Sequence, residues 1–226
     1  PVTFIGSNEL LKTKKQTEEG GGICVGKPVS GMQVAIIRIT DDPIHEWSNE
    51  LKLPQNKIGE ICVNGPVVTE TYYKRPKQTK LAKIIEQSTN TVWHRMGDVG
   101  YLDNQGRLWI CGRKTHRVET KDGTMFTLPC EAIFNKHPKV NLSALVGVKV
   151  KNNTIPVICI ETEKDVKLSS KVKRELTREL LSMAKEHEHT KSIETVRFYP
   201  RFPMDVRHNS KIAREKLAAW AQEVVS

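Results

Sequence analysis

Short apolar runs separated by Gly and Pro characterise the first half of the chain. Alternation of apolar and polar residues begins at Met32 and predicts a strand, which the acidic cluster at 41–43 ends. A second strand is predicted over 59–68, where Gly65-Pro66 closes it. Short strands with such punctuation indicate a small β-barrel or a distorted sheet.

Two further segments of this half are predicted from local composition. The polar run 12–19, followed by Gly20-Gly21-Gly22, is typical of a loop. The segment 71–79 reads as a short helix or turn that Pro76 halts. Neither segment changes the prediction of a β-rich first half.

The centre of the chain predicts a β-hairpin. Apolar-rich segments at 97–102 and 107–111 flank the turn sequence Asp103-Asn104-Gln105-Gly106. Asp, Asn and Gly supply the backbone conformations that such a turn requires. Gly112 follows directly, at a point where the backbone can bend.

After Gly112 the periodicity becomes mixed, and the order helix, strand, strand, helix, strand, helix is predicted. Ser169 or Ser170 can cap the long helix, whose apolar stripe includes Leu176 and Leu180. The predicted elements span 129–137, 142–150, 154–161, 170–187, 193–198 and 212–225. This αββαβα pattern predicts a compact α+β domain with three strands and its helices on one side of the sheet. We place the domain boundary at 112–115.

Composition narrows the class of protein. With 226 residues and 38% hydrophobic content, the chain can bury a core of one large or two small domains. The five cysteines are widely spaced without a C-x-x-C pair, which argues against a disulfide framework or a zinc site and favours reduced, packed thiols. We therefore expect no metal site and a cytoplasmic protein. No apolar run is long enough to cross a bilayer. No basic-then-apolar leader opens the chain, so we expect no secretory signal.

The net charge of +10 is compatible with a nucleic acid, an anionic membrane or a phosphorylated ligand. Much of that charge lies on 171–179, where acidic residues are interleaved. Such a pattern is typical of a solvated helix face, so we expect no nucleic-acid partner.

Five segments of the chain form a recognisable series of motifs. They are Gly26-Lys27-Pro28 with Gly31, Gly59 to Gly65 with Tyr73 to Thr79, Trp93 to Asp98, Leu108 to Arg113, and Pro203 to Arg214. In this order they resemble the motifs of the adenylate-forming superfamily, which includes acyl-CoA synthetases, peptide-synthetase adenylation domains and luciferases. The order of the motifs, rather than any one of them, makes the resemblance specific.

The resemblance covers only the last part of such an enzyme. The superfamily's Gly-rich phosphate loop and its Tyr-Gly-x-Thr-Glu segment do not occur in the chain. We therefore expect a C-terminal fragment, which alone would not catalyse the full reaction. Residues 1–112 would be the C-terminal subdomain of the large adenylating domain, and 113–226 the mobile C-terminal domain.

The resemblance implies a reaction that joins a carboxylate to ATP, giving an acyl-adenylate and pyrophosphate, with ATP/AMP and Mg²⁺ as cofactors. Asp98 matches the residue that holds the ribose; the alternative is a carboxylate that caps the turn beside Gly97. Arg113 matches a second ribose or phosphate contact; the alternative is a surface arginine. The hinge would lie at Lys114 and Thr115, although Thr115 stands where an Asp or Lys is usual.

Lys211 matches the superfamily's catalytic lysine in the motif "PxTxSGKxxR". Its ammonium group would act as an electrostatic clamp on the carboxylate and α-phosphate, not as a base. The match is imperfect, because Asn209-Ser210 replaces Ser-Gly and the segment before Lys211 is longer. The alternative is a surface lysine that opens the last helix.

The sequences of several motifs are similar to those of one branch of the superfamily, the bacterial olefin-biosynthesis β-lactone synthetases. This branch is implied by 96–100, 111–118 and 205–209, and by the lengthened loop after Arg113. Its members adenylate a β-hydroxy fatty acid, whose own hydroxyl then displaces AMP, so no thiol is required. A fatty acid-CoA ligase remains the first alternative, which leaves CoA open, and a non-catalytic basic binding domain the second. The expected partners are an acyl carboxylate, ATP and enzymes of the same biosynthetic route.

Overall fold

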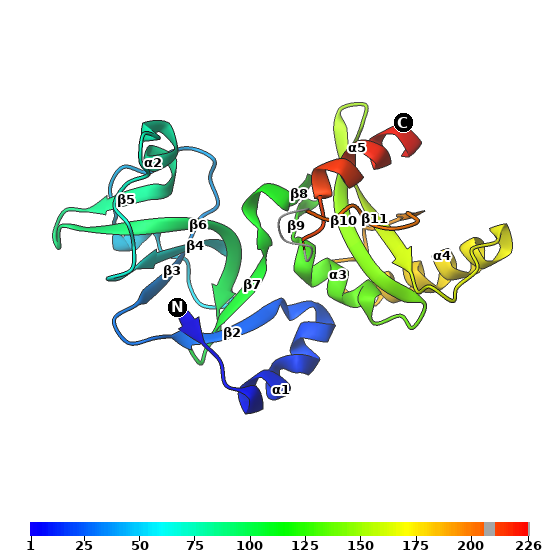
Figure 1. The fold of residues 1–226 in the computed structure, drawn as a ribbon, viewed down its shortest axis with the longest axis horizontal. Helices are drawn as coiled ribbons and strands as arrows, with labels where there is room; N and C mark the ends of the chain where they lie inside the picture. The colour runs from blue at the N-terminus through cyan, green and yellow to red at the C-terminus, as the bar shows by residue number, and fades with distance from the viewer. Residues whose placement is uncertain (206–210, 226) are drawn as a thin grey trace. The chain divides into compact units, whose positions relative to one another are not determined.

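The computed structural model describes residues 1–205 and 211–225. The chain divides into two compact units after Thr115. Unit 1 comprises Pro1–Thr17 and Gly21–Thr115, and unit 2 comprises Glu18–Gly20 and His116–Ser226. Both units are drawn in Figure 1, and each is described here by itself.

Unit 1 is built on a curled sheet with the strand order β1-β2-β7-β6-β4-β3, to which β5 is added along β6. Its strands are β1 (Thr3–Phe4), β2 (Ile23–Pro28), β3 (Gln33–Ile37), β4 (Gly59–Asn64), β5 (Lys83–Glu86), β6 (Thr91–Leu102) and β7 (Leu108–Arg113). The long strand β6 pairs with β4, β5 and β7, which closes the sheet into a half-barrel (Figure 1). The predicted barrel-like β-structure of the first half is confirmed.

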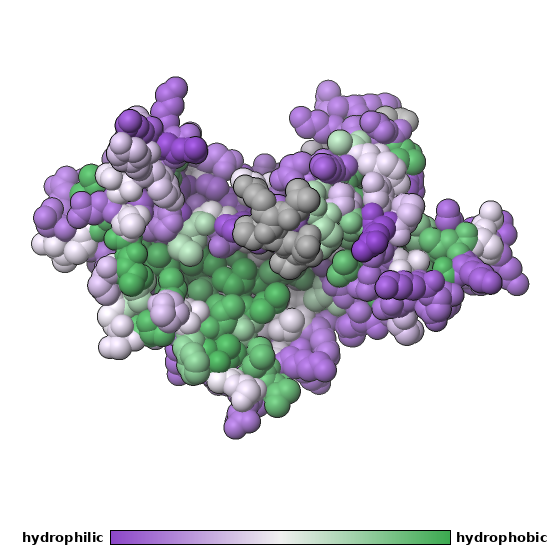
Figure 2. Space-filling model, in the orientation of Figure 1, coloured by the Kyte–Doolittle hydropathy of each residue, from purple (hydrophilic) through white to green (hydrophobic). Residues whose placement is uncertain are grey.

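Both faces of this sheet are apolar. On one face Trp47 stacks on Trp93 with ring centroids 4.0 Å apart, over Ile37 and Ile84. The other face gathers a second cluster of buried side chains, namely Met32, Ile36, Ile61, Val63 and Leu108. Figure 2 shows a broad hydrophobic area on the surface of unit 1. An exposed apolar area of this kind is typical of an interaction surface.

Helices correct two of the predictions for unit 1. The helix α1 (Ser7–Gln16) and a short π-helical turn (Thr17–Gly21) occupy the region predicted as a loop at 12–19. Lysines and Gln16 are good helix formers, with Glu9 in the first turn and lysines in the last, so the polar run is helical. Pro76 does not halt a helix but begins α2 (Pro76–Ala82), because a proline has no N–H to lose at the first helical position.

Unit 2 confirms the predicted αββαβα order and places a small hairpin before it. The hairpin is β8 (Val118–Thr120) with β9 (Gly123–Met125). The following elements are α3 (Thr127–Asn135), β10 (Val140–Val150), β11 (Asn153–Thr162), α4 (Ser170–Lys185), β12 (Thr195–Phe198) and α5 (Arg214–Val225). Strand β11 lies between an antiparallel β10 and a parallel β12. Among the described residues, short 3₁₀ turns lie at Asn49–Leu51 in unit 1 and at Lys114–His116, where the two units join.

The prediction that all helices lie on one side of the unit 2 sheet is wrong. Leu145 and Ile158 pack with α3 and α4 on one face, whereas Val146 and Val157 pack with α5 on the other. Strands β10 and β11 are apolar on both faces, so each face requires a helical cover. The N-terminus of α4 is capped as predicted, since Ser169 Oγ accepts the Val172 N–H at 3.2 Å.

All five cysteines are buried, and none of them forms a disulfide. Burial raises the pKa of the Cys111 and Cys159 thiols to about 12, which makes them unreactive as nucleophiles. Within the described part of the chain, no helix combines the length and the apolar character that crossing a membrane would require.

Candidate functional site

The hairpin of β6 and β7 is fixed by the carboxylate of Asp103 at its turn. Asp103 Oδ1 accepts the N–H groups of Gln105 and Arg107, both at 2.9 Å. Its Oδ2 accepts Arg107 Nε at 2.6 Å and Trp109 Nε1 at 2.9 Å. Burial would raise the pKa of Asp103, but these hydrogen bonds outweigh burial and lower it. A carboxylate that remains ionised therefore sets the register of the two strands.

That register places Asp98 directly opposite Arg113. Arg113 Nη1 lies 3.1 Å from Asp98 Oδ1, and the same nitrogen donates to Met96 O at 3.5 Å. The side chain of Asp98 is 25% exposed and that of Arg113 is 50% exposed. Asp98 lies inside β6 rather than at a turn, so the pair presents a carboxylate and a guanidinium side by side on a strand surface.

Unit 1 also contains a buried ionic cluster that sequence analysis did not find. Glu60 on β4 is 1% exposed, and its Oε2 accepts Arg95 Nη2 at 2.7 Å and Arg95 Nε at 3.2 Å. Lys114 Nζ lies 3.3 Å from Glu60 Oε1 and donates to Thr40 O at 2.9 Å. Arg95 also donates to the carbonyl oxygens of Asp42 and Leu81, at 2.8 and 3.0 Å. The cluster ties β4, β6 and Lys114 together within unit 1.

A signal for this cluster is present in the sequence. Glu60 and Arg95 are charged residues inside apolar strand segments, and a strand that buries a charge requires a partner for it. Sequence alone could not pair them, because they are separated by many residues along the chain and meet only when β4 pairs with β6.

Lys211 lies in unit 2, just before α5, and its side chain is exposed. Of the motif 203–214, residues 206–210 lie outside the described residues. The two ends of that segment are joined by a bridge between Met204 and Ile212 and by the Asp205 N–H, which donates to Lys211 O at 2.7 Å. The backbone at Lys211 is therefore fixed, while its side chain reaches solvent.

A buried ion pair positions the helix that follows Lys211. Arg214, the first residue of α5, binds Glu131 on α3 through two bonds, Nη1–Oε1 at 2.5 Å and Nη2–Oε2 at 2.8 Å. Glu131 Oε1 also accepts the Leu145 N–H at 2.8 Å. Burial raises the pKa of the Glu131 carboxyl, and Arg214 and the Leu145 amide counteract that rise. The pair fixes the start of α5 and hence the backbone that carries Lys211.

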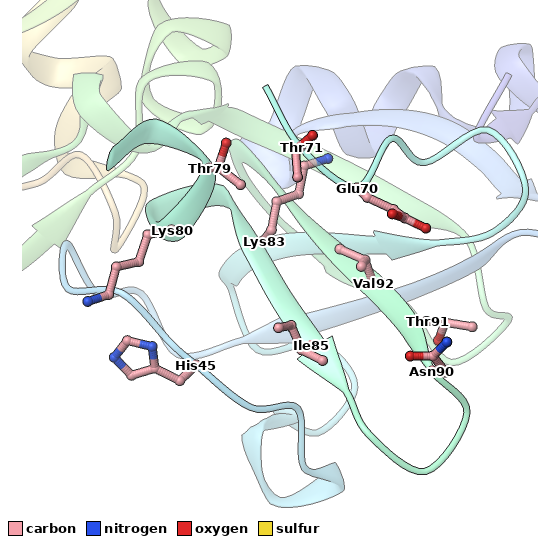
Figure 3. Close-up of a pocket in the computed structure, with 10 residues that line it drawn as sticks. All are labelled: His45, Glu70, Thr71, Thr79, Lys80, Lys83, Ile85, Asn90, Thr91 and Val92. Carbon is pink, nitrogen blue, oxygen red and sulfur yellow. The ribbon is translucent and has the colours of Figure 1, made fainter. Parts of the chain in front are cut away.

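Unit 1 also contains a pocket of about 410 Å³ beside α2 and β5 (Figure 3). In Figure 3 the Lys83 side chain extends toward Thr71, with Lys80 and His45 on another side of the pocket. Burial lowers the pKa of the Lys83 ammonium, whose Nζ donates to the backbone oxygen and the hydroxyl of Thr69.

The hydroxyl groups of this pocket serve the local fold. Thr79 Oγ1 donates to Arg75 O at 2.9 Å and accepts the Tyr72 N–H at 3.0 Å. Thr91 Oγ1 accepts Asn64 Nδ2 at 2.9 Å. The Thr79 contacts hold the loop before α2 on that helix, and the Thr91 contact joins β6 to β4. We assign no ligand to the pocket.

The described residues contain no group of three or more His, Cys, Asp or Glu side chains that could hold a metal ion. Of the predicted site residues, Asp98, Arg113 and Lys114 lie together in unit 1, with Thr115 at its end. Lys211 lies in unit 2.

Relatives with established names cover almost the whole chain. It is 46% identical over 226 residues to an olefin beta-lactone synthetase of Xanthomonas campestris pv. campestris, which is 99% of this chain and 40% of that protein. It is 42% identical over 224 residues to an olefin beta-lactone synthetase of Stenotrophomonas maltophilia, which is 98% of this chain and 40% of that protein. The chain thus spans about 40% of the length of these curated relatives. No protein-family model matches it.

The fold is similar to that of solved adenylate-forming enzymes. The anthranilate CoA ligase AuaEII, solved in complex with anthranoyl-AMP, superposes with a TM-score of 0.71 at 19% identity. The superposition covers 89% of this chain and 36% of that one. The fold of the chain is thus that of adenylate-forming enzymes. Its sequence is similar to the olefin beta-lactone synthetases over nearly its full length, as the motifs indicated.

The first prediction concerns the Glu131–Arg214 pair. Replacing Arg214 by Met leaves the Glu131 carboxylate buried without its cation, and we expect unit 2 to lose about 3–5 kcal/mol of unfolding free energy. Urea-dependent hydrogen exchange of the β10 and β11 amides reports that free energy for unit 2 alone. Lys216→Met, on the exposed side of α5, is the matched control and should change little. A loss no greater than that of the control would contradict the assigned role.

Proposed function

We propose that this chain is part of an ATP-dependent, AMP-forming ligase. The enzyme would adenylate a fatty or β-hydroxy fatty carboxylate, release pyrophosphate, and close a β-lactone. The identity of 46% and 42% to two olefin beta-lactone synthetases, over almost the whole chain, is the observation that carries this proposal.

In this proposal Asp98 and Arg113 bind the nucleotide. The Asp98 carboxylate is partly exposed, and it can accept hydrogen bonds from both hydroxyls of a ribose. Arg113, held 3.1 Å away, adds a donor for a phosphate or ribose oxygen. Because both residues lie on paired strands, their separation does not depend on a loop.

Lys211 acts in the adenylation step as a positive charge. Negative charge is redistributed between the carboxylate and the α-phosphate as the acyl-adenylate forms, and an ammonium group placed there stabilises it. The side chain suits this role because it is exposed and flexible, while its backbone is fixed through Met204, Ile212 and the Arg214–Glu131 pair.

The domain assignment is part of the same proposal. Residues 1–112 correspond to the C-terminal subdomain of a large adenylating domain, and 113–226 to a mobile C-terminal domain. The hydrophobic area of unit 1 supports this, since it offers the subdomain a surface on which the rest of the large domain packs (Figure 2).

We propose that the hinge between the domains is restricted to Thr115. Lys114 was expected to share the hinge, but its ammonium is held by Glu60 and by Thr40 O, and its side chain is only 14% exposed. Rotation about the bonds of Thr115 leaves these contacts intact, whereas rotation before Lys114 breaks them. Lys114 thus anchors the fixed side of the hinge.

The step that follows adenylation has two candidate products, a β-lactone and a CoA thioester. In β-lactone closure the β-hydroxyl of the substrate attacks the activated carbonyl and AMP leaves, so no thiol takes part. Formation of a CoA thioester is the second candidate, which is favoured by more distant relatives named as CoA ligases, at 26% identity. Product analysis of the intact enzyme with a β-hydroxy acid and ATP, with and without CoA, decides between them. A strict requirement for CoA would reject lactone closure.

The resemblance implies a magnesium ion. The described residues offer no group of three His, Cys, Asp or Glu side chains to hold it, so no residue of this chain is assigned to the ion.

We also propose a cytoplasmic location, because five buried cysteines without a disulfide suit a reducing compartment.

The second prediction tests Lys211. In the intact enzyme Lys211→Ala removes a charge that acts in the transition state, so the rate of ATP–pyrophosphate exchange should fall about 100- to 1,000-fold. Lys216→Ala, on the solvent side of α5, removes the same charge nearby and should leave the rate unchanged. Unaltered exchange in the Lys211 variant would remove this residue from the mechanism.

The third prediction tests Asp98. Its replacement by Ala removes the two acceptors offered to the ribose, so the KM for ATP should rise about 10- to 100-fold. The KM for the carboxylate should stay near its original value, because the ribose contact does not involve it. Asp122→Ala, on an exposed turn of unit 2, serves as the charge-matched control. An unchanged KM for ATP would refute the nucleotide contact.

The fourth prediction tests the anchor at Lys114. Lys114→Met keeps much of the side-chain volume but removes the bonds to Glu60 and Thr40, so hydrogen exchange in the segment 113–117 should accelerate. Lys57→Met, at an exposed position of unit 1, should leave that exchange unchanged. Equal exchange in the two variants would show that Lys114 does not restrain the hinge.

A further inference from the structure

The open edge of the unit 2 sheet carries a groove of about 460 Å³. Strand β12 is the last strand in the order β10-β11-β12, and the groove runs along it between α4 and α5. Val196, Phe198 and Trp220 provide its apolar lining. Tyr199 holds Trp220 in an edge-to-face contact, with ring centroids 4.7 Å apart.

The backbone of β12 presents hydrogen-bonding groups to this groove. The Tyr199 N–H donates to Ile160 O on β11 at 2.9 Å. Backbone groups of successive residues in a strand point to opposite edges, so the N–H and C=O of Phe198 and of Val196 point away from β11. The Val196 carbonyl oxygen agrees with this direction, because it accepts Arg197 Nη1 at 3.0 Å.

The groove is also strongly basic. Lys173 and Arg174 project from α4, and Arg197 projects from β12. Among the described residues that line the groove there is no carboxylate to balance these three cations. The guanidinium of Arg197 covers the strand edge, as charged side chains do where a protein protects an edge from unwanted pairing.

We propose that this groove docks an extended, acidic segment of a partner protein, which adds to β12 as a further strand. The backbone of the segment pairs with Phe198 and Val196, and its carboxylates contact Lys173, Arg174 and Arg197. Arg197 turns from the Val196 carbonyl to a carboxylate of the partner, which frees that carbonyl to accept a backbone N–H. Apolar side chains of the segment lie on Trp220, which packs on the α5 face of the sheet, opposite the α4 face that carries Lys173 and Arg174.

The strand edge favours a peptide over an anionic amphiphile. A fatty carboxylate can satisfy the cations and the apolar lining, but it has no backbone amides to pair with Phe198 and Val196. The proposal is independent of adenylation, since none of these residues belongs to the nucleotide or catalytic site proposed above.

The experiment uses a short, end-blocked peptide of alternating Glu and Val, titrated into the chain. Trp220 reports binding through its fluorescence, because the other tryptophans are buried in unit 1. We expect saturable binding that weakens as salt is added, together with slower hydrogen exchange at 196–198. A control peptide of the same composition has its Glu residues in one run and its Val residues in another. It cannot place its charged and apolar side chains on opposite sides of a strand, so it should bind more weakly.

Two variants on one helix provide the matched test. Arg174→Glu reverses a charge in the groove and should weaken the Glu-Val peptide about tenfold or more. Arg178→Glu makes the same change on α4 outside the groove and should leave the affinity unchanged. Far-ultraviolet circular dichroism verifies that both variants are folded.

Three results would overturn the proposal. They are the absence of saturable peptide binding, equal affinity in the two arginine variants, and a Trp220 response to sodium decanoate but not to the peptide. The last result would identify the groove as a site for an anionic amphiphile.

Discussion

The buried carboxylate of Glu60 is the constraint on which unit 1 depends. It lies between Arg95 and Lys114, and those cations in turn bind the backbone at Thr40, so the loop at 40–42 and strands β4 and β6 are held at one point. A buried charge is costly unless it is fully paired, so the cluster tolerates little displacement of any member. The Asp98–Arg113 pair is built on this frame, because Arg95 is on the same strand as Asp98 and Lys114 follows Arg113 directly.

In unit 2 a buried Glu–Arg ion pair likewise fixes the backbone near Lys211. Glu131 is nearly inaccessible to solvent and is bound at both oxygens by Arg214, at the first position of α5. Lys211 lies just upstream, beyond the bridge from Met204 to Ile212. In each unit, therefore, a buried Glu–Arg pair fixes the backbone beside a residue that remains partly or fully exposed. A charged side chain with an anchored backbone can move its head group without losing its place, which suits an electrostatic role.

Much of the fold could be predicted because periodicity reports which side of an element is buried. The β-rich runs on either side of 151–153 located β10 and β11, and the apolar stripe at Leu176 and Leu180 located α4. The error arose because these runs were not read for which faces of the strands are buried. Both faces are apolar and need a cover, whereas the helices were predicted on one side only. The motifs located Asp98, Arg113 and Lys211, but the pairings Glu60–Arg95 and Glu131–Arg214 depend on long-range strand and helix contacts that no local pattern encodes.

The contacts of Lys114 change which residue carries the charge at the proposed hinge. Where the resemblance leads one to expect a charged residue at the pivot, this chain has Thr115, and the charge sits one residue earlier on Lys114. A charged residue at the pivot would exchange partners as the chain rotates, whereas Lys114 keeps its partners because Glu60 and Thr40 belong to its own unit. In the proposed rotation the pivot is therefore a small, uncharged residue within a short 3₁₀ turn. The expected consequence is a pivot whose energetics depend little on ionic strength, since the ion pairs that anchor it are buried and are not broken by the motion.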